Sequence, residues 1–123
     1  MSKLLFPIMY LENKDFDQDL NLNIGSDVII MIQANYCNHC TRCKPDYQEF
    51  AEYMYKNHNN VTIATIQTDD TDNNMSDITA VINDSPGVPC FLMYKNSRKV
   101  SVHEGSRTKE GFYKFYRDNN ELK

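Results

Sequence analysis

The sequence has no excess of basic residues, no long hydrophobic run and no internal repeat, and each absence narrows the range of functions. It contains 13 Lys and Arg against 17 Asp and Glu, which gives a net charge of −4. This balance disfavours nucleic-acid binding, because phosphate recognition normally needs a basic stripe. No apolar run approaches the roughly 18–20 residues of a membrane span, and the N-terminal segment lacks the apolar core of a secretory signal. We therefore expect a cytoplasmic protein with no nucleic-acid or membrane partner.

The pattern along the chain predicts a single α/β domain over residues 1–123, since this length leaves no room for a second core. Short apolar runs rich in β-branched residues predict strands that alternate with amphipathic helices. The expected strands cover 7–11, 28–32, 61–66, 89–94 and 99–103. The expected helices cover 15–20, 37–56, a segment capped at Asn74 or Ser76 that ends near Ile82, and a last segment capped by Thr108; turns are expected at 84–87 and 95–98. This order favours a central mixed sheet flanked by helices.

Four cysteines are present, and three of them lie within seven residues of one another, at Cys37, Cys40 and Cys43. So tight a cluster is poorly suited to stapling a secreted domain. In an intracellular chain it points to redox catalysis or to metal binding.

The spacing Cys37-x-x-Cys40, directly after a buried strand and at the start of a helix, favours redox chemistry. Unpaired backbone N–H groups and the helix dipole stabilise a thiolate at that point. We expect Cys37 to titrate below the reference thiol value of about 8.5 and to be the attacking thiolate. Cys40 lies one turn further on, where it can close a tight disulfide with Cys37 as the resolving thiol. His39, between them, would add positive charge beside Cys37 when protonated.

These residues resemble the thioredoxin superfamily, and the resemblance runs over most of the chain. Residues 36–40, Tyr-Cys-Asn-His-Cys, are similar to the aromatic-Cys-Gly-His-Cys site of protein disulfide isomerase domains, with Asn38 in place of Gly. Pro45 falls eight residues after Cys37, where the family carries a helix-kinking proline. The segment 87–89, Gly-Val-Pro, resembles the family's cis-proline segment, and Gly105 lies sixteen residues beyond it, where the family places a glycine beside its substrate groove.

The resemblance implies a thioredoxin fold and a thiol–disulfide oxidoreductase that exchanges disulfides with protein substrates and with a redox partner protein. No organic cofactor and no metal would be needed. Pro89 would be cis, and the backbone of Val88 would pair with an extended substrate segment. Tyr36, Val88, Pro89 and Gly105 would frame a shallow apolar patch around the sulfur of Cys37.

Two positions depart from the family pattern. The buried carboxylate that the family usually carries six residues before Cys37 is replaced by Met31, and the aromatic residue usual further along the strand is replaced by Gln33. Without the carboxylate, deprotonation of Cys40 should be slower. An alternative function therefore stays open, namely an adaptor that captures partner proteins at the Val88–Pro89 groove with little turnover.

The remaining cysteines and histidines have less specific interpretations. Cys43 and Cys90 are expected to be core residues, because a buried free cysteine behaves as a small hydrophobe. A zinc site of three thiolates with His39 or Cys90 is a further alternative, although one helix would spread its sulfurs along a face. His58 and His103 stand apart from the cluster and are interpreted as solvated surface residues.

Overall fold

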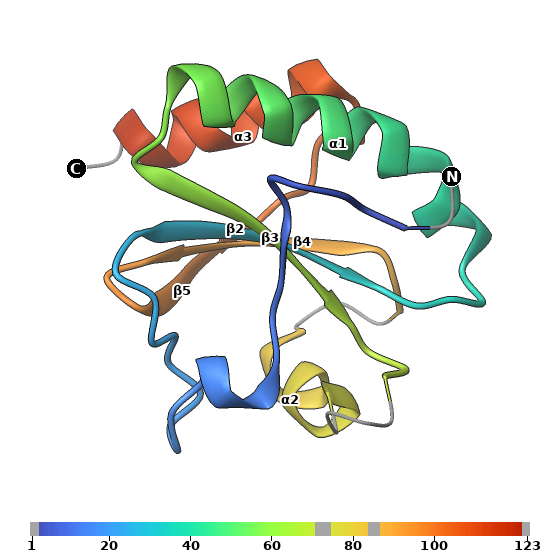
Figure 1. Cartoon of the computed structure of the whole chain (residues 1–123), viewed down its shortest axis with the longest axis vertical. Helices are drawn as coiled ribbons and strands as arrows, with labels where there is room; N and C mark the ends of the chain where they lie inside the picture. The colour runs from blue at the N-terminus through green and yellow to red at the C-terminus, as the bar shows by residue number, and fades with distance from the viewer. Residues whose placement is uncertain (1–2, 71–74, 84–86, 122–123) are drawn as a thin grey trace.

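The computed structural model of the chain describes residues 3–70, 75–83 and 87–121, in which helices lie on both faces of a five-stranded sheet (Figure 1). The strands are β1 (Met9–Tyr10), β2 (Asp27–Gln33), β3 (Val61–Gln67), β4 (Cys90–Lys95) and β5 (Arg98–Val102). The helices are α1 (Asn38–Asn57), α2 (Met75–Ile82) and α3 (Lys109–Glu121). The alternative cap at Asn74 and residues 84–86 of the expected turn lie outside the described residues.

The sheet is mixed, in the order β1-β3-β2-β4-β5. Strand β3 pairs in parallel with both β1 and β2, whereas β4 pairs antiparallel with β2 and with β5. Strand β2 is therefore central, which explains why its sequence is a continuous apolar run instead of an alternating one. The predicted α/β class with a mixed sheet is confirmed.

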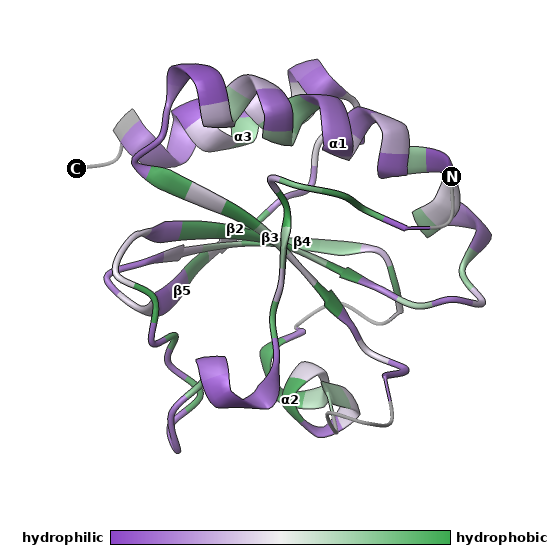
Figure 2. Cartoon of the chain, in the orientation of Figure 1, coloured by the Kyte–Doolittle hydropathy of each residue, from purple (hydrophilic) through white to green (hydrophobic). Residues whose placement is uncertain are grey.

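Each face of the sheet has its own hydrophobic core. Helices α1 and α3 cover one face and α2 covers the other (Figure 1). Colouring by hydropathy shows α1 and α3 as largely hydrophilic, whereas α2 carries more hydrophobic residues (Figure 2). The core under α1 and α3 is rich in aromatic side chains, and Tyr47, Phe50 and Phe112 are among the largest that are fully buried.

The expected helix over 15–20 is wrong. A short 3-10 turn, Asn13–Asp15, ends at the first residue of this segment, and the chain then folds back on itself so that Phe16 pairs with Leu22. The side chain of Asp17 accepts hydrogen bonds from the backbone N–H groups of Asp19 and Asn21, each at 2.9 Å. A side chain that binds nearby backbone donors in this way competes with helix formation, and Leu20 takes a positive φ of 62°.

The expected hairpin over 95–98 and the expected cap at Thr108 are both present. Asn96 and Ser97 connect β4 to β5 with positive φ values of 53° and 70°, the left-handed pair that a tight two-residue hairpin requires. At the start of α3, the hydroxyl of Thr108 accepts the backbone N–H of Gly111 at 3.0 Å, which satisfies one of the helix's unpaired donors.

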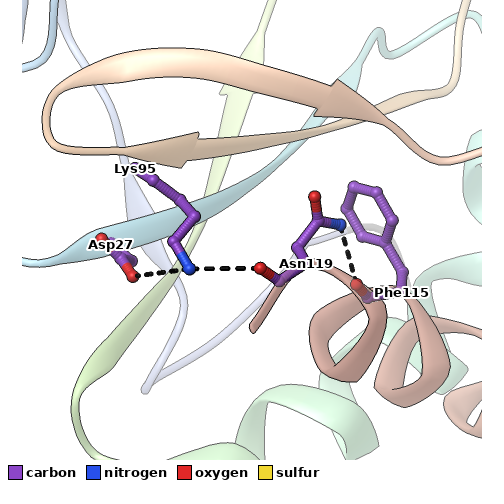
Figure 3. Close-up of polar contacts among 4 residues, drawn as sticks. All are labelled: Asp27, Lys95, Phe115 and Asn119. Atoms are coloured by element: carbon purple, nitrogen blue, oxygen red, sulfur yellow. Dashed lines mark hydrogen bonds and ion pairs between the residues drawn. The ribbon is translucent and has the colours of Figure 1, made fainter. Parts of the chain in front are cut away.

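One side chain ties the end of β4 to the last helix and to the start of β2. The Nζ of Lys95 lies 3.2 Å from the carbonyl oxygen of Asn119 and 3.8 Å from a carboxylate oxygen of Asp27 (Figure 3). The side-chain amide of Asn119 in turn donates to the carbonyl oxygen of Phe115 at 2.8 Å. These contacts hold the C-terminal turn of α3 against the start of β2 and the end of β4, at the opposite end of β2 from the cysteines.

Candidate functional site

The two cysteines of the Cys-x-x-Cys motif meet where β2 leads into α1. Cys37 is the N-cap of α1, and its Sγ accepts the backbone N–H of Cys40 at 3.0 Å. The two residues form a disulfide with a Cα–Cα distance of 5.2 Å. Cys37 is 7% exposed and Cys40 is fully buried, so that the first sulfur is the one nearer to solvent. The predicted placement of the pair at a helix N-terminus is confirmed.

The backbone before Pro89 faces the first sulfur. The Sγ of Cys37 lies 3.5 Å from the carbonyl oxygen of Val88, a residue 51 positions further along the chain. The Val88–Pro89 peptide bond is cis. Pairing of β4 with β2, which sets Cys90 opposite Ile32, brings this segment to the end of the sheet where α1 begins.

A pocket of about 300 Å³ lies on the α2 side of the sheet, and neither Cys37 nor Cys40 is among its lining residues. Tyr36, Gly87 and Val88 line one part of it, and Thr79 of α2 lines another. The side chain of Tyr36 is 75% exposed, which leaves an aromatic ring accessible next to Cys37. The structure thus brings Tyr36 and Val88 to one pocket, but Pro89 does not line it, and the expected substrate patch around Cys37 stays a prediction. Both of the residues between the cysteines, Asn38 and His39, are exposed.

Gly105 does not line this pocket. It belongs to a second hollow of about 290 Å³ between β5 and α3. A Cβ atom on Gly105 would come within 2.9 Å of Cε1 of His103, so the absence of a side chain lets the loop approach the imidazole closely. Its role beside the substrate stays a prediction.

The interpretation of His103 as a solvated surface residue is wrong. Its ring is half-buried and packs against Phe91, Phe112 and Phe115, with centroid separations of 5.9, 5.6 and 5.0 Å. Its Nε2 lies 2.7 Å from the carbonyl oxygen of Ser106 and can donate to it. Burial lowers the pKa of His103 below its ordinary value, because the apolar surroundings disfavour the imidazolium. His58 is also half-buried among tyrosine rings.

We expect His103 to make the fold less stable in mild acid. Because its pKa is lower in the folded protein than in the unfolded chain, the unfolded chain binds the extra proton as the pH falls through about 6.5. Urea unfolding near pH 7.5 and near pH 5.5 should show a larger loss of stability for the parent chain than for His103→Gln. An equal loss in both proteins would contradict the assignment.

An uncharged chain of hydrogen bonds ends at Met31, the position at which the family usually carries a buried carboxylate. Met31 is fully buried and pairs with Thr65 of β3. The side-chain amide of Gln33 donates to the hydroxyl of Thr65, which donates to the carbonyl oxygen of Met31, each at 2.8 Å. Gln33 Oε1 is buried without a hydrogen-bond partner. The sequence pattern does not indicate Thr65, because its proximity to Met31 depends on strand pairing.

The two other cysteines are buried on opposite faces of the sheet, which confirms their expected place in the core. Cys43, on α1, donates its S–H to the carbonyl oxygen of Cys40 at 3.4 Å, and burial raises its pKa. Cys90 belongs to the core on the α2 side. Within residues 3–70, 75–83 and 87–121, no group of three or more His, Cys, Asp or Glu side chains could hold a metal ion.

Two charged residues, one on α1 and one just after β3, are buried in a way that the sequence did not predict. Lys44 is only 3% exposed although it carries a charge, and Asp69 has one carboxylate oxygen buried without a hydrogen-bond partner. The helical spacing from Cys40 to Lys44 to Gln48 puts Lys44 on a buried row of α1. That spacing is the signal that could have revealed it.

Comparison with known proteins gives a consistent result. A family model described as Thioredoxin matches residues 7–118. Among solved structures, the zinc-bound form of human ERp44 aligns with a TM-score of 0.74 at 20% identity, over 90% of this chain and 31% of that chain. The first thioredoxin domain of mouse protein disulfide-isomerase A4 aligns with a TM-score of 0.73 at 23% identity, over 94% and 77% of the two chains.

The first two thioredoxin domains of Naumovozyma dairenensis Eps1p align with a TM-score of 0.72 at 23% identity, over 91% of this chain and 40% of that one. Identities at this level show the fold alone, and the predicted thioredoxin fold is confirmed. The chain spans about a third of the length of the ERp44 chain. A comparison with curated proteins finds no match.

Proposed function

Because the chain belongs to the thioredoxin family, we propose that it is a thiol–disulfide oxidoreductase whose working dithiol is Cys37 and Cys40. The observation that carries the proposal is the position of the pair. One sulfur is the N-cap of α1 and accepts a backbone N–H there, and its partner lies one turn deeper in the core. A helix N-terminus favours the thiolate form, which is the reactive species in disulfide exchange.

The proposed reaction begins with the reduced protein. The Cys37 thiolate attacks one sulfur of a substrate disulfide, a Cys37–substrate disulfide forms, and the other substrate sulfur leaves as a thiolate. The Cys40 thiolate then attacks the Cys37 sulfur, which closes the Cys37–Cys40 disulfide and releases the second substrate thiolate. The two electrons that reduce the substrate come from the two thiols, and the released thiolates take up the protons that Cys37 and Cys40 have lost.

The substrates would be proteins that offer an extended segment around a cysteine. Supporting this, the Val88 carbonyl lies beside the Cys37 sulfur, and exposed Tyr36 lines a pocket together with Val88. A backbone next to the reacting sulfur could pair with such a segment as an added strand. A redox partner protein would regenerate the dithiol, without an organic cofactor. None of the described helices could cross a membrane, and a cytoplasmic location stays a prediction.

The adaptor function remains the second candidate because of Met31. A fully buried methionine stands where the family's carboxylate would assist the second thiol. If resolution of the mixed disulfide were very slow, the chain would act mainly by holding its partners. The reduction potential of the Cys37–Cys40 couple separates the possible directions of exchange: a value near roughly −270 mV favours a reductant, and one near about −180 mV an oxidant or isomerase.

A trapping experiment distinguishes the two candidates. In Cys40→Ser the resolving thiol is absent, so we expect a stable Cys37 mixed disulfide with a disulfide-containing peptide, detected by mass spectrometry of the adduct and reversed by dithiothreitol. Cys37→Ser should form no such adduct. If Cys37→Ser binds the reduced peptide as tightly as the parent chain does, and the reduced parent chain does not reduce the disulfide form of the peptide, the adaptor function is favoured and the enzyme is rejected.

A further inference from the structure

The buried lysine of α1 is the feature that the proposed chemistry leaves unexplained. Lys44 is 3% exposed, whereas lysines are almost never buried without a compensating interaction. It lies four residues after Cys40 on the same helix, and side chains with this spacing are neighbours on one helical face. Helical side chains generally point back toward the helix N-terminus, which for Lys44 is the end of α1 where Cys40 lies.

The second charged group in this region is the carboxylate of Asp69, just after β3. Its Oδ2 accepts the backbone N–H of Asn35 at 3.0 Å, in the loop that leads to Cys37. Its Oδ1 is buried without a hydrogen-bond partner. Lys44 and Asp69 are close enough to interact electrostatically. The negative charge of Asp69 therefore raises the pKa of Lys44, and the same carboxylate holds the loop that leads to the dithiol.

The charges around Lys44 determine whether this region raises or lowers the pKa of a nearby thiol. Burial lowers the pKa of Lys44, while the Cys43 thiolate and Asp69 raise it. The pKa of Cys43, on the same turn, is raised by burial and by the negative charge of Asp46. The positive charges of Arg107 and Lys44 lower it. Among these groups only Lys44 combines a positive charge, almost complete burial and the four-residue spacing from Cys40.

We propose that Lys44 is a positioning residue that favours the thiolate of Cys40 and so speeds the resolution of the mixed disulfide, in the place of the missing carboxylate at Met31. This inference rests on the proposed function. Its chemical basis is that a nearby positive charge stabilises a thiolate, and that a buried pair of opposite charges is screened less than a surface pair.

The step that Lys44 would assist is the second sulfur transfer. The Cys40 thiol loses its proton to solvent, and its thiolate attacks the Cys37 sulfur of the mixed disulfide. The Cys40–Cys37 bond forms, the bond between Cys37 and the substrate sulfur breaks, and the departing thiolate takes a proton from solvent. Lys44 keeps its own proton throughout and acts only through its charge.

The test uses dithiobis(nitrobenzoate) as the disulfide and the full reduced chain. Attack by Cys37 releases one coloured thiolate, and attack by Cys40 on the resulting adduct releases a second. The two phases therefore report the two thiols separately in one stopped-flow trace. In Cys40→Ser the fast second phase should be absent, which assigns it to Cys40.

In Lys44→Met we expect the second phase to slow by about tenfold near pH 7 and its pH midpoint to rise, while the first phase changes little. Lys44→Arg, which keeps the charge, should retain most of the rate. Lys56→Met, which removes an exposed lysine from the same helix, is the matched control and should leave both phases unchanged.

The outcomes separate the two proposals. If no first phase exceeds that of Cys37→Ser, the proposed function itself fails. If the first phase is present but Lys44→Met leaves the rate and midpoint of the second phase unchanged, the function stands and the role of Lys44 is rejected. Equal slowing in Lys44→Met and Lys44→Arg would mean that side-chain shape matters instead of charge, and would also overturn the inference. Methionine is similar in length and suits a buried site, so the variant should fold.

Discussion

Replacing Cys37 with serine is expected to abolish disulfide exchange. A hydroxyl does not form the thiolate that attacks a disulfide, and the deeper cysteine, Cys40, is fully buried and cannot replace it as the attacking group. In an insulin-reduction assay with dithiothreitol as the final reductant, we expect the catalysed rate to fall at least about 100-fold, to the uncatalysed background. The readout is the turbidity of the precipitating insulin chains.

The matched control for this result is Cys90→Ala, which removes a buried cysteine on the opposite face of the sheet. It should retain most of the activity of the parent chain. The unfolding midpoint of Cys37→Ser should be compared with that of the reduced parent chain, so that loss of the fold is not mistaken for loss of chemistry. A Cys37→Ser variant that folds and still reduces insulin at the parent rate would reject the proposed function.

Replacing Tyr47 with alanine should cause the largest loss of stability. Tyr47 is fully buried and its ring packs against Phe112, Phe91 and Phe50, with centroid separations of 5.3, 5.6 and 6.1 Å. Its hydroxyl donates toward the carbonyl oxygens of Ala64 at 2.8 Å and Ile29 at 3.2 Å. Truncation leaves a cavity between α1, α3 and the sheet, so we expect the free energy of unfolding to fall by about 3–5 kcal/mol.

Two companion variants divide this effect into its causes. Tyr47→Phe keeps the ring and removes the hydroxyl, and should cost about 1–2 kcal/mol because a buried carbonyl loses a donor. Tyr55→Ala removes a tyrosine of the same helix that is 57% exposed, and it should change the free energy of unfolding by less than about 1 kcal/mol. All three are measured by urea unfolding with a common slope. A cost below about 1 kcal/mol for Tyr47→Ala would contradict the packing described here.

The elements predicted correctly are those whose sequence signal is local and repeated. The run 28–32 is apolar throughout, as a strand buried on both faces must be, and the structure buries it in the centre of the sheet. The long amphipathic pattern from Cys37 gave α1 to within one residue at each end. The helix expected over 15–20 is absent. The composition of this segment suits a helix, but the carboxylate of Asp17 binds backbone N–H groups and so competes with helix formation.

The histidine and lysine environments were not predictable in the same way. His103 is half-buried because α3 returns across the sheet and brings Phe112 and Phe115 to its ring, and nothing near His103 in the sequence indicates this. Lys44 lies on a row of α1 that the helical spacing marks as inward. Its position relative to Asp69 depends on where β3 ends, and helix periodicity contains no information about that.

By itself, the sequence determined that two cysteines lie one turn apart at the start of a helix that follows a buried strand, because that arrangement requires only neighbouring residues. The tertiary structure decided which groups surround their sulfurs. The Val88 carbonyl reaches Cys37 through the pairing of β4 with β2, and Thr65 is set against Met31 by the pairing of β3 with β2. The physical reason is that strand order and register follow from the packing of the whole sheet, so the chemical surroundings of the dithiol are fixed only when distant segments come together.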